Sequence, residues 1–228
     1  MKVKSEFSKH ANEYAEVNTI QQEVVQKLLA SMTTHPKNIL DLGCGSGAIC
    51  RAIEWEFDSF IGIDFADGML QLHPKSDKIV SNYGDFNSAD TFDKLAKKKF
   101  DHIFSASALQ WATDLEKVFE QISLLSSSVS LAIFTSGTFQ TLHQTALLDS
   151  LLLSKEEINR LQQKYFDANF EVITYRLEFQ NVREMFKYIK RSGVSGSRNV
   201  LSFKETKKLM RSYPLHYLEF EVAFITSR

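Results

Sequence analysis

The segment between residues 41 and 47 has the composition of a ligand-binding turn. Asp41 is followed by three glycines at alternate positions, Gly43, Gly45 and Gly47. Glycine lets the backbone turn sharply and lets a ligand approach without a Cβ in the way. The free N–H groups of the helical segment that follows would face such a ligand. The dinucleotide pattern G-x-G-x-x-G is excluded because Ala48 stands at its last position, and no Gly-Lys-Ser/Thr of a P-loop follows.

Three more polar residues, Asp64, Asp85 and Ser105, stand near the ends of apolar runs. These runs alternate with helical segments along residues 39 to 135, which indicates parallel crossovers and a doubly wound sheet. In such sheets the ligand binds beyond the carboxyl ends of the strands. We therefore expect these residues and Asp41 at that edge.

The remaining elements are predicted from the periodicity of apolar residues. An amphipathic helix before the first strand carries Ile20, Val24, Val25 and Leu28 on its apolar face. Strands are expected at residues 39–42, 60–64, 78–81, 100–104, 128–135, 170–179 and 215–226. Helices are expected within residues 7–33 and at residues 49–56, 67–72, 89–98, 114–125, 139–153, 156–166, 182–189 and 202–211.

The pattern D-x-G-x-G-x-G at residues 41 to 47 resembles motif I of the class I S-adenosylmethionine-dependent methyltransferases. Segments at residues 60–64, 84–86 and 100–105 resemble further landmarks of that family, at the intervals it requires. The resemblance implies an α/β fold with a doubly wound, mostly parallel seven-stranded sheet of the Rossmann-like type. It also implies N-terminal helices, a helical lid inserted after strand five, and an antiparallel pair of strands at one edge.

The same resemblance implies S-adenosyl-L-methionine as cofactor and S-adenosyl-L-homocysteine as product. Asp64 would accept hydrogen bonds from the ribose hydroxyls, Asp85 would meet the adenine amino group, and Phe86 would pack on the ring. Gln110 and Trp111 would line the substrate side, although Trp111 could instead cover the sheet edge. The full expected cofactor set is Gln21, Asp41, Gly43, Cys44, Gly45, Asp64, Phe65, Met69, Asp85, Phe86, Ser105 and Ala106.

Length and composition indicate a single domain with a substantial core. The chain has 228 residues, 43% of them hydrophobic, and 18 phenylalanines. We expect one methyltransferase domain over residues 1–228, with an N-terminal helical segment (1–35), a cofactor-binding core (36–136), and lid helices with C-terminal strands (137–228). No signal peptide or membrane-spanning run is expected, so we predict a cytoplasmic monomer that binds no membrane. Cys44 and Cys50 are expected as reduced thiols, and no residues have metal-ligand spacing, so no metal is expected.

Charge is unevenly distributed along the chain. Residues 183 to 211 hold nine basic and two acidic side chains, a net charge of +7, so the rest of the chain carries −8 of the total of −1. Such a run is often only a solvated face, but the asymmetry suggests an acidic partner. Nucleic acid and an acyl carrier protein are the two candidates.

Further segments resemble the biotin-pathway malonyl-[acyl-carrier protein] O-methyltransferases. They are Phe7-x-Lys9-x-Ala11-x-x-Tyr14, residues 108–111, the exit from the fifth strand at residues 134–144, and residues 188–193 and 213–217. The resemblance implies methyl transfer to the free carboxylate of a malonyl thioester on acyl carrier protein, or on coenzyme A. The product would be the malonyl methyl ester that starts pimeloyl and biotin synthesis. Asn18-Thr19 and Arg191 depart from that family's pattern.

Three alternatives stay open at this stage. The trans-aconitate methyltransferases share several of these segments, and a non-catalytic protein could use the same fold to bind S-adenosylmethionine. An RNA methyltransferase could use the basic stretch, but Ser105-Ala-Ser-Ala stands where methyltransferases of exocyclic amines carry Asn/Asp-Pro-Pro-aromatic. We therefore expect no nucleic-acid substrate.

Carboxylate methylation requires orientation of the acceptor rather than a general base, because a free carboxyl group is already ionised at neutral pH. Tyr14, Lys190 and Arg191 are the residues expected to orient it, with Arg176 in reserve. The surface expected to meet the acidic carrier protein comprises Arg198, Lys204, Lys207, Lys208 and Arg211.

Overall fold

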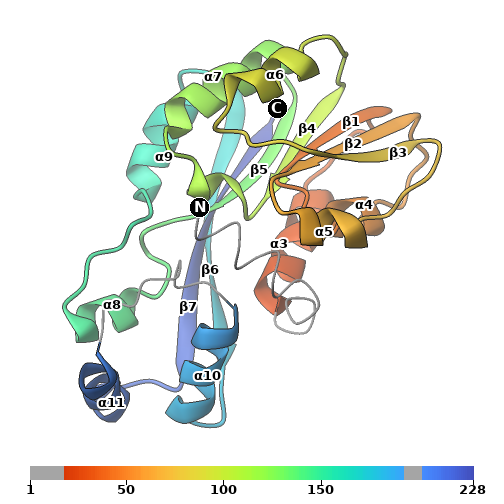
Figure 1. The fold of residues 1–228 in the computed structure, drawn as a ribbon. Helices are drawn as coiled ribbons and strands as arrows, with labels where there is room; N and C mark the ends of the chain where they lie inside the picture. Colours follow the sequence, from red (N-terminus) through yellow and green to blue (C-terminus); the bar gives the residue numbers. More distant parts are fainter. Residues whose placement is uncertain (1–17, 193–201) are drawn as a thin grey trace.

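The computed structural model describes residues 18–192 and 202–228 of the chain. Its centre is a seven-stranded sheet with the strand order β3-β2-β1-β4-β5-β7-β6 (Figure 1). Strands β1 to β5 are mutually parallel, whereas β7 runs antiparallel to both of its neighbours, β5 and β6. The predicted fold class is confirmed, including the antiparallel pair at one edge. The strands are β1 Asn38–Leu42, β2 Ser59–Asp64, β3 Ile79–Tyr83, β4 His102–Ala106, β5 Val129–Phe134, β6 Ala168–Glu178 and β7 Tyr217–Ser227.

Helices cover both faces of the sheet, which explains why its central strands are apolar throughout. On one face, Leu40, Ile103 and Leu131 share a core with α6, α7 and α9. On the other face, Ile39 and Phe104 share a second core with α3 and α4. These helices are α3 Thr19–Ala30, α4 Ala48–Ala52, α6 Ala89–Leu95, α7 Leu115–Leu125 and α9 Lys155–Gln162.

The antiparallel pair projects beyond the rest of the sheet. Both β6 and β7 have 11 residues, but β5 pairs only with the second half of β7, up to Val222 opposite Phe134. Three helices gather around the projecting part (Figure 1), namely α8 Gln140–Ala146, α10 Val182–Ser192 and α11 Phe203–Ser212. Met185, Tyr213 and Phe220 join this part to the core of the α3 face. Whether these helices act as a lid stays a prediction.

Several predicted helix boundaries were wrong, and the leucine-rich segment after α8 shows why. The helix predicted over residues 139–153 ends at Ala146, because Leu147 adopts a left-handed conformation with φ 54°. The N–H groups of Leu147 and Leu148 then donate to the carbonyls of Gln144 and His143, which closes the helix. Composition did not reveal this, since leucine normally favours helix. Similarly, α4 and α9 are shorter than predicted, whereas α5 Asp67–Leu72 agrees with its prediction and α11 begins after an N-cap at Ser202.

A buried histidine links β4 to β5 at a distance from the predicted ligand edge. The ring nitrogens of His102 lie 2.7 Å and 2.9 Å from the hydroxyls of Ser128 and Ser130, and only 3% of the residue is exposed. Burial lowers the pKa of His102 to about 4. The neutral ring is therefore the form that the fold stabilises.

This pKa predicts a specific dependence of stability on pH. Between pH 6.5 and 4 the unfolded chain takes up a proton that folded His102 does not, so the free energy of unfolding should fall by up to about 3 kcal/mol. His102→Gln should be less stable at pH 7 but should lose less stability over this range. Urea denaturation at several pH values measures both effects, with exposed His216→Gln as the control. Equal slopes for His102→Gln and the wild type would contradict the prediction.

Candidate functional site

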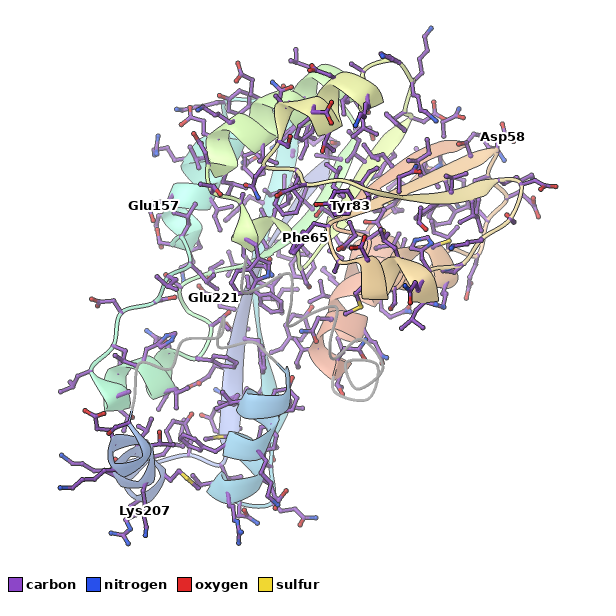
Figure 2. All side chains as sticks on the ribbon, viewed as in Figure 1. Asp58, Phe65, Tyr83, Glu157, Lys207 and Glu221 are labelled. Atoms are coloured by element: carbon purple, nitrogen blue, oxygen red, sulfur yellow. The ribbon has the colours of Figure 1, made fainter. Side chains whose placement is uncertain are left out.

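A cavity opens at the carboxyl ends of β1, β2 and β4, the edge that the sequence predicts. Residues from α3, α5 and the short helix η1 Leu109–Trp111 complete its walls. Figure 2 labels Phe65, which follows β2 and lines this cavity. Of the residues expected at the cofactor or substrate, those that line the cavity are Gln21, Asp41, Gly43, Cys44, Gly45, Asp64, Phe65, Met69, Phe86, Ala106 and Trp111.

The glycine turn after β1 has the conformation that its sequence requires. Gly43 and Gly45 both have positive φ, +74° and +51°, in the region that favours glycine. A Cβ at Gly43 would lie 2.2 Å from the Cβ of Ala108, so only glycine fits there. A Cβ at Gly45 would meet no atom of the described residues within 4 Å. The backbone at Gly45 is therefore accessible to a ligand.

Asp64 fastens this turn to the end of β2. Its Oδ2 accepts the N–H of Gly45 at 2.9 Å, and its Oδ1 accepts the N–H of Ala66 at 2.7 Å. Burial raises the pKa of Asp64, while these backbone N–H groups oppose the increase. Each carboxylate oxygen retains lone-pair capacity, so Asp64 can still accept hydrogen bonds from a vicinal diol in the cavity.

Asp41 is a buried carboxyl group in the cavity wall. Only 1% of the residue is exposed, and no group in the described part of the chain hydrogen-bonds to Oδ1. Burial, reinforced by the nearby charge of Asp64, raises the pKa of Asp41 to about 8. A buried carboxylate without a partner is costly, so the site favours a ligand that brings a cationic group to Asp41.

Three expected residues do not line the cavity. Oγ of Ser105 donates to the carbonyl of Leu42 at 2.6 Å, because β4 continues to Ala106 and Ser105 still lies within the strand. Oδ1 of Asp85 accepts from both the N–H and the Nδ2 of Asn87, at 2.8 and 2.9 Å. The side chain of Gln110 donates to the carbonyl of Ser107 at 2.7 Å. These three side chains hold the strand ends and loops that carry the lining residues.

Other lining residues were missed by the sequence reasoning. Val25 lies four residues after Gln21 on α3, so the helical period could have placed it on the same face. Ala48 and Ile49 begin the helix after the glycine turn, and their position could also have been inferred. For Ser107, which has φ 60°, the sequence gives no signal. The complete missed set is Asn18, Val25, Ser46, Ala48, Ile49, Ala66, Ser107 and Ala108.

The residues expected to orient the substrate are only partly described. Tyr14 and Arg198 lie outside the described residues. Lys190 and Arg191 belong to the last turn of α10, but their side chains are also outside the described part. Arg176, the reserve residue, is exposed on β6, with its guanidinium carbon 5.1 Å from the centre of the Tyr217 ring. It therefore lies on an exposed strand face rather than in the cavity.

Comparison with known proteins agrees with this geometry. A family model described as "Methyltransferase domain" matches residues 40–126. The chain is similar to malonyl-[acyl-carrier protein] O-methyltransferases from Acetivibrio thermocellus, at 26% identity over 97% of this chain and 91% of the relative, and from Haemophilus influenzae, at 26% identity over 86% and 78%. The YcgJ protein of Bacillus subtilis has the same fold, with TM-score 0.61 and 14% identity over 90% of this chain and 99% of that one.

The domain match over residues 40–126 and the fold are those of a class I S-adenosylmethionine-dependent methyltransferase. In the described part of this methyltransferase, no group of three or more His, Cys, Asp and Glu side chains is arranged to hold a metal ion. Within the same residues, no helix is both long and apolar enough to cross a membrane.

The raised pKa of Asp41 predicts opposite effects of Asp41→Asn on stability and on cofactor binding. A raised pKa in the folded state favours stability at low pH, and this contribution is lost as pH rises from about 4 to 8. Asp41→Asn should therefore make the ligand-free protein more stable than the wild type at pH 8. The same variant should bind S-adenosylmethionine at least about tenfold more weakly, because its amide cannot neutralise a cation.

Denaturation at pH 5 and pH 8, together with calorimetric titration of S-adenosylmethionine, measures both effects. Asp58→Asn, at an exposed carboxylate far from the cavity, is the control (Figure 2). A variant less stable than the wild type at pH 8, or one with unchanged affinity for the cofactor, would contradict this role of Asp41.

Proposed function

We propose that this methyltransferase transfers a methyl group to the free carboxylate of a malonyl thioester carried by acyl carrier protein. The observation that carries the proposal is the extent of the similarity to proteins named malonyl-[acyl-carrier protein] O-methyltransferase. For the Acetivibrio thermocellus relative it covers 97% of this chain, well beyond the common domain at residues 40–126. The similarity therefore includes α8, α10 and α11, which lie outside the cofactor-binding core.

The cavity fits the cofactor of the family in three respects. S-adenosylmethionine supplies an electrophilic methyl group on a sulfonium sulfur, and it also carries an ammonium group, ribose hydroxyls and adenine. Asp64 would accept hydrogen bonds from the hydroxyls, and the buried Asp41 would lie toward the cationic end. Phe86 and Met69, each 3% exposed, would form apolar walls for the adenine. Asp85 would meet the adenine amino group only if its carboxylate reoriented from Asn87.

The chemistry of a carboxylate acceptor suits a site without a general base. A carboxyl group with an ordinary pKa near 4 is already ionised at neutral pH and needs no proton transfer. The protein must bring the acceptor oxygen into line with the methyl group and keep water away. Trp111 and Ala108 offer an apolar wall on the substrate side, and Tyr14, Lys190 and Arg191 are the residues proposed to orient the anion.

The basic face of α11 supports an acidic protein as the carrier of the substrate. Lys204, Lys207, Lys208 and Arg211 are all exposed and recur at helical spacing. Lys207 lies at the far end of the molecule from α6 and α7 (Figure 2). We call these four side chains the basic face, and with Arg198 they form the proposed contact with the carrier protein. Such charges mainly accelerate association and select the partner.

Offering four methyl acceptors side by side tests the proposed function. Malonyl carrier protein, malonyl-coenzyme A, trans-aconitate and total RNA would each be incubated with labelled S-adenosylmethionine. We expect transfer to both malonyl thioesters, with the higher kcat/KM for the carrier protein, and a methyl ester identified by mass spectrometry. Preferential methylation of trans-aconitate would instead indicate a small-molecule carboxylate methyltransferase. Cofactor binding without transfer to any acceptor would indicate a non-catalytic protein.

A further inference from the structure

The loop between α8 and α9 exposes a concentration of large apolar side chains. Residues 147–153, which we call the leucine loop, have the sequence Leu-Leu-Asp-Ser-Leu-Leu-Leu. Leu147 is 92% exposed, Leu151 59% and Leu153 38%. A single exposed leucine needs no explanation, but three within seven residues are a concentration of exposed apolar side chains that favours an interaction site.

The leucine loop is held in place by specific hydrogen bonds. Leu147 closes α8 in a left-handed conformation, a position usually given to glycine, and its side chain is directed into solvent. At the other end, the carbonyl of Leu153 accepts the N–H of Ser136 at 2.9 Å, which fixes the loop to the exit of β5. Leu152 is partly buried against the core between these ends. The exposed leucines are therefore presented by a fixed backbone.

This loop continues from α8, the helix that packs against α11 and its basic face. It begins directly at the end of α8, and α8 contacts α11 at the same end of the molecule (Figure 1). Its last residue is tied to Ser136, next to the carboxyl-end edge of the sheet where the cavity opens. The leucine loop thus runs from α8, which packs against α11, to the carboxyl-end edge of the sheet.

We propose that the leucine loop and the basic face together form the docking surface for the carrier protein, an inference that rests on the proposed function. The partner that fits is an acidic protein surface with apolar side chains at its centre. The leucines would contribute buried apolar area, and the lysines would steer the approaching carrier protein and fix its orientation.

Two features favour a protein partner over a lipid surface. A helix that binds at a membrane surface turns its apolar side outward, whereas Leu209 of α11 and Tyr213, its C-cap residue, are buried in the protein. In addition, exposed Asp149 lies between the exposed leucines, and exposed Glu156 follows them at the start of α9. Both carboxylates would approach the anionic headgroups together with the leucines.

Three variants separate the parts of the surface. Leu147→Asn combined with Leu151→Ser removes the apolar part, and asparagine tolerates the left-handed conformation at position 147. Lys207→Glu combined with Lys208→Glu reverses part of the basic face. Leu124→Asn, at an exposed leucine on α7, is the matched control. Steady-state kinetics with malonyl carrier protein and malonyl-coenzyme A are measured for each variant at low and high salt.

The leucine variant should raise KM for malonyl carrier protein about tenfold at either salt concentration, because apolar contacts are not screened. The lysine variant should raise the same KM mainly at low salt, since exposed charges are screened over about 10 Å at 0.1 M. Neither variant should change kcat/KM for malonyl-coenzyme A, and the control should resemble the wild type. Unchanged carrier-protein kinetics in the leucine variant, or an equal loss with both thioesters, would overturn the proposal.

Direct binding distinguishes failure of the surface from failure of the proposed function. Fluorescence anisotropy with acyl carrier protein that bears no malonyl group should show weaker binding to both surface variants and wild-type binding to the control. This readout decides the proposal even if neither thioester is methylated, in which case only the proposed function fails. Loss of vesicle binding or of a dimer in the leucine variant, with carrier-protein binding unchanged, would assign the surface to a membrane or to a second copy of the chain.

Discussion

The site depends on the hydrogen bonds between the glycine turn and the end of β2. Gly43 and Cys44 donate their N–H groups to the carbonyl of Ile63, and Gly45 donates to the carboxylate of Asp64. Two neighbouring strands thus end in one hydrogen-bonded unit at the edge of the sheet. Any change in the register between β1 and β2 would separate the turn from this carboxylate, so the parallel pairing of these strands sets the geometry of the cavity.

The two apolar cores make ionisation of the buried carboxyl groups beside the glycine turn unfavourable. Asp41 and Asp64 belong to the buried strands β1 and β2, where water cannot solvate a carboxylate. Backbone N–H groups stabilise the carboxylate of Asp64, whereas no group of the described residues hydrogen-bonds to Oδ1 of Asp41. The fold therefore disfavours ionisation of Asp41, and a cationic ligand would favour it. Asp41 is therefore expected to favour ligand binding and not the stability of the ligand-free protein.

The cofactor-binding core could be predicted from the sequence largely because each of its elements is marked by a short local pattern of residues. Strands buried on both faces give continuous apolar runs, and the alternate glycines after Asp41 mark the turn that joins them. The prediction failed where one residue changes the outcome: β4 extends two residues further than expected, which places Ser105 within the strand. It also failed at Leu147, where a left-handed residue ends a segment whose composition favours helix. The exposure of the leucine loop could not be predicted from helical periodicity or from a motif, because it is set by tertiary packing.

The central claim is that the cavity beside the glycine turn binds S-adenosylmethionine through Asp64. Calorimetric titration of the cofactor into the wild-type protein and into Asp64→Ala tests it most directly, with thermal denaturation to verify that the variant is folded. Losing the hydrogen bonds of the carboxylate should weaken binding by about 2 kcal/mol, which corresponds to roughly a 30-fold increase in Kd. An unchanged Kd in a folded Asp64→Ala protein would contradict this account.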